Sequence, residues 1–99
     1  MRAHRLGSYL VPISRARDKS VARAFGSRLR SVRLAQGFTQ ERLAHTAELH
    51  PTYISNCERG YSAPTLETLL RLAGALGVRP GELVDELDLP ARPAKPGGR

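Results

Sequence analysis

The sequence predicts an all-α fold, a compact arrangement of five helices with a basic tail at each end. Apolar residues recur at intervals of three and four positions in successive segments, which is the spacing of one helix face. Threonine and proline stand where these segments begin and glycine where they end, as at helix boundaries. No segment of comparable length alternates apolar and polar residues as a half-buried strand does. A chain of 99 residues is long enough for one domain with one modest core.

The first predicted helix has about four turns, because apolar residues at helical spacing run from Val21 to Val32 before Gln36–Gly37 ends it. The second helix is short. Thr39 supplies its N-cap hydroxyl, and the helix dipole favours Glu41 in its first turn. The inward faces comprise Val21, Phe25, Leu29 and Val32 in the first helix and Leu43, Ala44 and Ala47 in the second.

The third predicted helix covers residues 51–59. Pro51 suits a first helical position, where a backbone N–H would have no partner in the helix. Gly60 suits the left-handed residue that follows a helix. His50, which stands at the N-cap position, is a poor residue for that role.

Two further helices are predicted after Pro64. Thr65 caps the fourth, which Gly77 ends, and a short fifth helix runs from Pro80 to Leu87. The predicted apolar stripe of the fourth helix is Leu66, Leu69, Leu70, Ala73 and Leu76. In the fifth helix we expect Leu83, Val84 and Leu87 to be buried and Glu82, Asp85 and Glu86 to face solvent.

The domain is expected to span residues 20–88, between two flexible tails. Residues 1–19 lack helical periodicity and form a basic arm, and residues 89–99 are too rich in proline and glycine to pack. The net charge of +7 is divided as +4 in residues 1–20, +3 in 21–60, −3 in 61–88 and +3 in 89–99. A domain with one basic end can present it to a polyanion, and nucleic acid is the leading candidate. The same net charge also suits a soluble protein without an anionic partner.

Several classes of protein are disfavoured. The chain has no apolar run of the roughly 18 residues that a membrane span needs and no signal-peptide pattern, so we expect a cytoplasmic protein. Cys57 is the lone cysteine, and we expect an inert buried thiol rather than a redox sensor or ligand. His45 and His50 lack a third metal ligand, and Ser55 lacks a base. We therefore expect no enzyme activity, no metal site and no cofactor.

Residues 40–59 have the spacing of two short helices that bury facing sides across a tight turn, with Ala44 small where they cross. This pattern resembles the helix-turn-helix of the lambda-repressor-like, xenobiotic-response-element (XRE) family of DNA-binding proteins. The resemblance covers residues 21–87, with "RLRSVRLAQGFTQERLA" similar to the first two helices, "YISNCERG" to the recognition helix and "APTLETLLRLAGALGV" to the fourth helix. It implies a sequence-specific transcriptional regulator, expected to be a repressor that reads the major groove of double-stranded DNA with residues 51–59.

In that family the second helix of the motif lies in the major groove, with its first turn at the base edges. The resemblance therefore implies that Pro51, Thr52, Ser55 and Asn56 face the bases. The Asn56 amide can donate and accept one hydrogen bond each, which matches the N6 and N7 edge of adenine. Thr52 offers a methyl group for thymine and a hydroxyl for either partner, whereas Pro51 offers apolar contact alone. Without the motif, these would be ordinary surface residues.

The resemblance assigns other residues to the DNA backbone. Gln40, at the start of the preceding helix, is implied to bond a phosphate, aided by the positive end of its own helix. Arg59, Tyr61 and Ser62, at and beyond the end of the recognition helix, are candidates for the opposite phosphate wall. Tyr53 is left open between a place in the core and a DNA contact.

Two further positions follow from the resemblance. Glu58 is implied to form a structural ion pair with Arg33, which would keep the acid ionised and tie the first helix to the third. Glu48 stands at the turn position where the family prefers glycine, and a left-handed non-glycine residue costs on the order of 1 kcal/mol. A slightly remodelled turn is expected.

The family implies a homodimer on a near-palindromic operator, because one recognition helix buries too little surface for selective binding. Leu83, Val84 and Leu87, or the tail after them, are the expected contact, although the same residues could seal the core of a monomer. The basic arm could follow the minor groove. The alternative function is an antitoxin or scaffold subunit on the same fold, with its tails gripping a protein partner.

Overall fold

The computed structural model describes residues 19–88, and the predictions for the tail residues 1–18 and 89–99 lie outside the described residues. The described residues form five helices and no strand, which confirms the predicted all-α class. Within this part of the chain, none of the helices has the length and apolar character to cross a bilayer. The helices are α2 (Ser20–Ala35), α3 (Gln40–Ala47), α4 (Pro51–Glu58), α5 (Leu66–Leu76) and α6 (Gly81–Val84).

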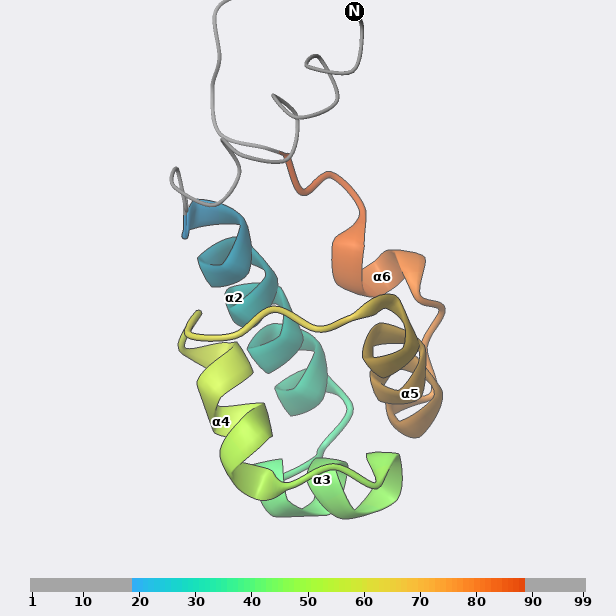
Figure 1. The fold of residues 1–99 in the computed structure, drawn as a ribbon. Coiled ribbons are helices and arrows are strands. Elements are labelled where there is room, and N and C mark those ends of the chain that lie inside the picture. Colours follow the sequence, from blue (N-terminus) through green and yellow to red (C-terminus); the bar gives the residue numbers. More distant parts are fainter. Residues whose placement is uncertain (1–18, 89–99) are drawn as a thin grey trace, which may run out of the picture.

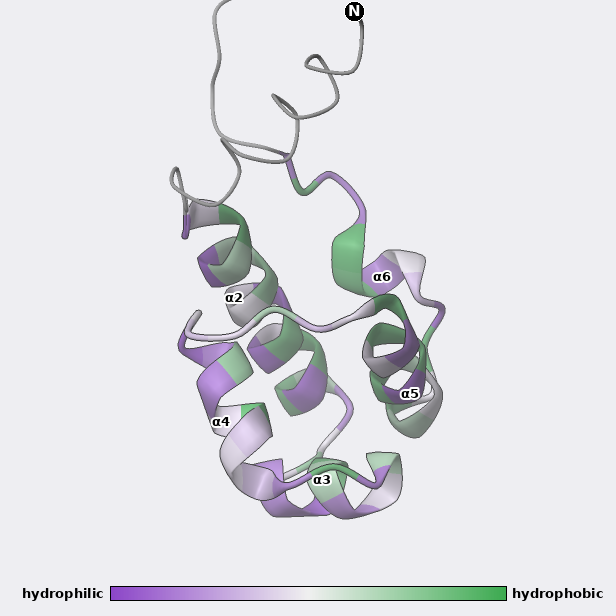
Figure 2. Ribbon diagram, viewed as in Figure 1, coloured by the Kyte–Doolittle hydropathy of each residue, from purple (hydrophilic) through white to green (hydrophobic). Residues whose placement is uncertain are grey.

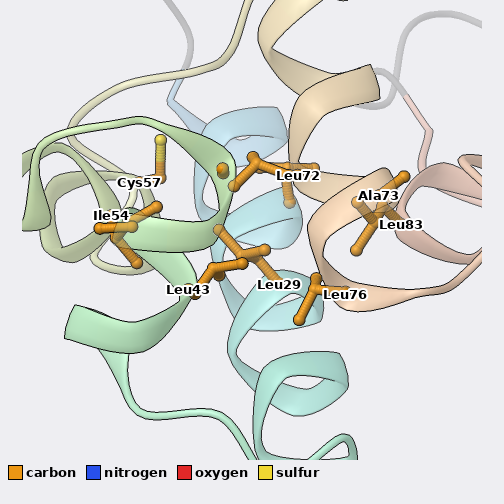
Figure 3. Close-up of a cluster of buried hydrophobic side chains, with 11 residues drawn as sticks. Leu29, Leu43, Ile54, Cys57, Leu72, Ala73, Leu76 and Leu83 are labelled. Carbon is orange, nitrogen blue, oxygen red and sulfur yellow. The ribbon is translucent and has the colours of Figure 1, made fainter.

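Helix α2 lies between α4 on one side and α5 with α6 on the other, and α3 closes one end (Figure 1). It packs against α4 and α6, while α3 packs against α4 and α5. Leucine side chains from four helices meet at the centre (Figure 3). The core comprises Phe25, Leu29, Leu43, Ala44, Ala47, Ile54, Cys57, Leu72, Ala73, Leu76 and Leu83. The motif formed by α3 and α4 is therefore fixed by two neighbours, since α2 packs against α4 and α5 packs against α3.

The buried face of α5 differs from the predicted stripe. Leu66 and Leu70 are 71% and 49% exposed, whereas Leu72, which the predicted stripe omitted, is completely buried. Leu70 lies on the flank of the helix rather than on the line through Ala73 and Leu76, and Leu66 is in the first turn, short of the core. Both residues were wrongly predicted to be buried.

The last helix is shorter than predicted, because α6 ends at Val84 rather than at Leu87. Arg28 of α2 donates to the backbone carbonyls of Glu82 (3.0 Å) and Asp85 (2.7 Å). This guanidinium satisfies carbonyls at the helix end. The chain then leaves the helical conformation at Asp85, with φ −56° and ψ 133°. Of the apolar residues predicted to be buried here, Leu83 is buried, but Val84 is 37% exposed.

Gly26 sets the distance between α2 and α4. A Cβ atom at this position would lie 2.2 Å from the carbonyl oxygen of Cys57 and 2.7 Å from that of Glu58. Such separations are far inside van der Waals contact, so the two helix backbones can approach this closely only because the residue is glycine. The end of α4 therefore rests directly on the backbone of α2.

Candidate nucleic-acid interface

The turn between α3 and α4 is an ordinary left-handed helix end, so the slight remodelling expected at Glu48 is not found. Thr39 caps α3 by accepting a hydrogen bond from the backbone N–H of Arg42 at 3.0 Å. Glu48 ends the helix in the left-handed conformation, with φ 62° and ψ 46°. The backbone N–H of Leu49 then donates to the carbonyl of Ala44 at 2.8 Å, which closes the turn. Ala44 is completely buried where the two helices meet.

The start of α4 is capped by the side chain of His50. Nδ1 of His50 accepts a hydrogen bond from the backbone N–H of Thr52 at 3.1 Å. Histidine, although not a favoured N-cap, supplies a side-chain cap here, because a neutral imidazole nitrogen can accept a hydrogen bond as a hydroxyl or carboxylate does. Pro51 occupies the first turn, where no backbone N–H is required.

The two sides of α4 differ in burial. Ile54 and Cys57 are completely buried against the core. On the other side Pro51 and Thr52 are exposed, and Ser55 and Asn56 are half-buried at the surface. Figure 2 colours α4 mainly in purple and pale tones, in contrast to the green of much of α5.

The residues after α4 form a linked polar group. The guanidinium of Arg59 donates to Oδ1 of Asn56 at 3.2 Å. The same guanidinium lies over the Tyr61 ring, 4.8 Å from its centroid, in a cation–π contact. Tyr61 is exposed and Ser62 is half-buried. The structure therefore brings a predicted base-contacting residue and two predicted phosphate-contacting residues into one connected surface.

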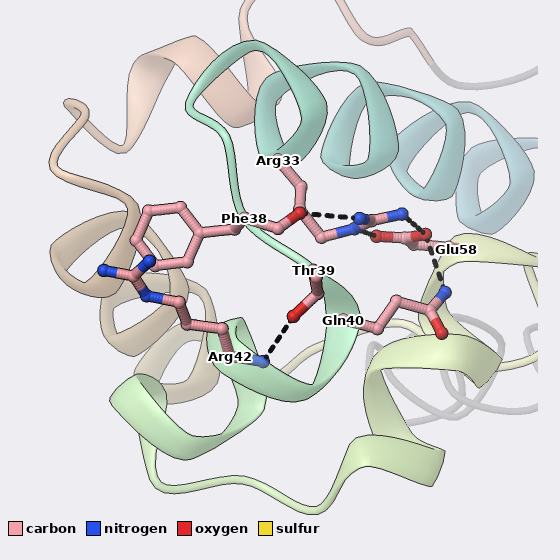
Figure 4. A network of polar contacts seen from close by, with 6 residues as sticks. All are labelled: Arg33, Phe38, Thr39, Gln40, Arg42 and Glu58. Atoms are coloured by element: carbon pink, nitrogen blue, oxygen red, sulfur yellow. Dashed lines mark hydrogen bonds and ion pairs between the residues drawn. The ribbon is translucent and has the colours of Figure 1, made fainter.

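An ion pair between Arg33 and Glu58 is present (Figure 4). Arg33 donates through Nε to Oε2 at 2.5 Å and through Nη2 to Oε1 at 2.9 Å. Its third donor, Nη1, reaches the carbonyl of Phe38 at 2.8 Å. The hydrogen bond to Glu58 raises the pKa of Arg33 above its ordinary value, so the guanidinium keeps its charge.

Gln40 joins this pair from α3. Its Nε2 donates to Oε1 of Glu58 at 3.0 Å (Figure 4). A primary amide has two N–H groups and one carbonyl, so this bond leaves one N–H and the carbonyl for other partners. Arg33, Glu58 and Gln40 thus connect α2, α4 and α3 at a single carboxylate.

Tyr53 and Cys57 belong to the inner side of α4. Tyr53 is half-buried and packs against the core. This favours a structural role for its ring over a contact with DNA. Burial raises the pKa of the Tyr53 phenol and of the Cys57 thiol. A neutral thiol buried in this way is a poor nucleophile. Within residues 19–88 no group of three His, Cys, Asp or Glu side chains is placed to hold a metal ion.

Sequence reasoning did not identify the structural roles of three residues. His50 caps α4 and Gly26 allows α4 to approach α2, and both therefore position the interface. Arg28 instead binds the end of α6. The local sequence gave a usable signal for His50, which directly precedes a proline at a helix start. For Gly26 and Arg28 the partners lie far away in the sequence, so their roles depend on the fold.

Comparisons with known proteins agree with this geometry. A helix-turn-helix family model matches residues 29–83. The chain is 42% identical over 62 residues to control protein C.BamHI of Bacillus amyloliquefaciens, covering 62% of this chain and 76% of that protein. The restriction-modification controller protein C.AhdI from Aeromonas hydrophila superposes with a TM-score of 0.61 at 42% identity, covering 63% of this chain and 94% of that one.

A further solved structure is the C.Esp1396I restriction-modification controller protein, a tetramer in complex with its natural 35 base-pair operator. It superposes with a TM-score of 0.62 at 29% identity, over 69% of this chain and 90% of that one. The resemblance inferred from the sequence is therefore confirmed. The chain belongs to the helix-turn-helix family, as a DNA-binding transcriptional regulator of the XRE type.

Proposed function

We propose that this regulator is a repressor that binds a near-palindromic operator as a homodimer, with α4 in the major groove. The observation that carries the proposal is the two-sided burial of α4. Its apolar side is sealed in the core, while Thr52 is exposed and Asn56 lies at the surface. A helix held from behind with short polar groups in front suits the major groove, which admits one α-helix. By occupying a promoter, such a protein would block polymerase.

The base-reading role is proposed for Pro51, Thr52, Ser55 and Asn56. The hydrogen bond from Arg59 supports Asn56 in this role, because it holds the amide in one orientation. A carbonyl oxygen has two lone pairs, so Oδ1 can still accept from an adenine N6 while Nδ2 donates to N7. Thr52 adds a methyl group suited to thymine. Specificity would thus favour A·T pairs under the first turns of α4.

The phosphate-binding role is proposed for Gln40, Arg59, Tyr61 and Ser62. Gln40 lies in the first turn of α3, where the helix dipole favours an anion. Glu58 accepts one of its two amide N–H groups, which leaves the other for a phosphate oxygen. The positive charge of residues 21–60 would add a sequence-independent attraction.

Selection of bound sequences from random duplexes tests the regulator proposal. We expect one near-palindromic site to be enriched, two chains per site, and an affinity that falls steeply with salt. Thr52→Glu should abolish binding, because its carboxylate would face the DNA. Thr46→Glu is the matched control, since Thr46 is also exposed but lines a hollow with Arg71 and Gly74 of α5. Equal, salt-insensitive affinity for every duplex would overturn the proposal.

A narrower role is favoured by one observation. The 42% identity to C.AhdI, a restriction-modification controller, supports the proposal that this chain controls restriction and modification genes. The test is to isolate the genomic fragments that the chain binds in its own host. We expect sites upstream of endonuclease or methyltransferase genes. Binding sites only upstream of other genes would contradict this narrower role, while the proposal of a DNA-binding repressor would still stand.

A further inference from the structure

Arg23 of α2 lies against the residue that follows α4. A Cβ atom at Gly60 would come within 2.5 Å of Cγ and 2.9 Å of Cα of Arg23. Gly60 is buried, with the stem of Arg23 over it, whereas Arg23 itself is exposed. Gly60 directly follows Arg59, which is also exposed. The side chains of Arg23 and Arg59 therefore leave the backbone from neighbouring points, where α4 ends beside α2 (Figure 1).

Acidic side chains do not balance the charges of these two arginines. Helix α2 contains no Asp or Glu, and neither do residues 59–66. The carboxylate of Glu58 is close in the sequence, but it is 3% exposed and already accepts hydrogen bonds from donors of α2 and α3. Within residues 19–88 the Arg23 guanidinium takes part in no ion pair.

Two unbalanced cations at one place repel each other, which lowers the stability of the folded chain. Local choices that cost stability are typical of functional sites. A guanidinium presents a planar fork of hydrogen-bond donors that matches a phosphate group. We propose that Arg23 and Arg59 bind one DNA phosphate between them, as a phosphate clamp at the end of α4. This inference rests on the proposed function, to which it adds Arg23 as a DNA-binding residue.

The clamp is partly prepared before DNA binds. The guanidinium of Arg59 is held by its hydrogen bond to Asn56 and by the Tyr61 ring, so it loses little freedom on binding an anion. Contacts to the DNA backbone fix the register and orientation of a protein on the duplex. Because Arg59 also bonds Asn56, a phosphate in the clamp would set the position of a proposed base-reading side chain.

Salt titration of DNA binding by the full chain tests the clamp. Arg23→Met keeps the apolar stem over Gly60 but removes the charge. Affinity for every duplex should fall, and the slope of log affinity against log salt should become shallower by about 0.9 for each bound chain. Chemical denaturation should show no loss of stability, because the repulsion from Arg59 is removed. Arg79→Met is the matched control. Arg79 is exposed before α6, across α2 from α4, and its loss should leave the slope unchanged.

A second measurement locates the phosphate. Single uncharged methylphosphonates replace the phosphates of the selected operator, one position in each duplex. At one position of each half-site the replacement should weaken the unmodified chain more than Arg23→Met, which has already lost one of the two cations. An unchanged salt slope in Arg23→Met, or the same loss at every position in both proteins, would overturn the inference alone. Salt-insensitive binding of every duplex by the unmodified chain would overturn the proposed function as well.

Discussion

Arg33 near the end of α2 and Glu58 at the end of α4 share two hydrogen bonds although they lie 25 residues apart. Their side chains are only 6% and 3% exposed. The pair therefore fixes the end of α4 against α2 with a charge-assisted, bidentate contact. Because Gln40 donates to the same carboxylate, one acidic group sets the relative positions of three helices.

Glu58→Ala should lower the free energy of unfolding by roughly 3 kcal/mol, because it leaves the buried Arg33 charge without its partner. Chemical denaturation monitored by circular dichroism measures this loss. Glu67→Ala is the control. It breaks the exposed pair between Arg71 and Glu67 on α5, and the loss should stay below about 0.5 kcal/mol. Equal effects of the two substitutions would contradict a structural role for the buried pair.

Gly26→Ala and Gly74→Ala should change stability in opposite directions. Both residues are helical, and alanine is favoured over glycine in a helix by about 1 kcal/mol. A Cβ atom on Gly74 meets no atom within 4 Å, so this variant should be more stable by about that amount. A Cβ atom on Gly26 collides with the backbone of α4, and overpacking should outweigh the helical gain by about 1–3 kcal/mol. Denaturation midpoints measure both, and a stabilised Gly26→Ala would refute the close approach.

Glu48→Gly should stabilise the domain by up to about 1 kcal/mol, because glycine adopts the left-handed conformation at φ 62° without a steric penalty. The exposed contact of Glu48 with Arg71, at 3.6 Å, adds little to stability. Glu48→Ala separates the two effects, since alanine removes the charge but keeps the Cβ atom. We expect no stabilisation from alanine, and thermal melts of both variants check this.

Stability should fall at alkaline pH through Cys57. Burial raises the pKa of this thiol, so the folded chain keeps its proton after the unfolded chain has lost it. The stabilisation is complete below the unfolded-state pKa of about 8.5 and is lost as pH rises from there through the folded pKa. Denaturation at a series of pH values above 8 measures the slope. In Cys57→Ala the slope should be shallower, and an unchanged slope would assign it to other groups.

The helix-turn-helix itself was predictable because its signals are local. Thr39 and Pro51 mark helix starts, and Gly60 takes the left-handed conformation expected after α4, with φ 81°. Ala44 is buried as its position in the motif requires. Spacing within about twenty residues was enough to define these features.

The errors arose where a distant partner decides the outcome. The end of α6 depends on Arg28, which reaches carbonyls 54 and 57 residues away. The rotation of α5 that buries Leu72 and exposes Leu70 depends on which side of the helix faces its neighbours. Helical periodicity alone does not decide which side is buried, because the leucines of α5 fit more than one apolar face at helical spacing.

Asn56→Ala and Gln40→Ala should weaken DNA binding in different ways. Loss of the Asn56 amide should relax the preference at one position of each half-site, at a cost of about 1–3 kcal/mol for the preferred base pair. Loss of the Gln40 amide should weaken binding to all sequences alike, because a phosphate contact carries no base information. Selection from random duplexes with each variant measures both effects, and unchanged unfolding curves exclude a loss of fold. If Asn56→Ala left the selected sequence unaltered at every position, Asn56 would be a surface residue and another side chain of α4 would have to read the operator.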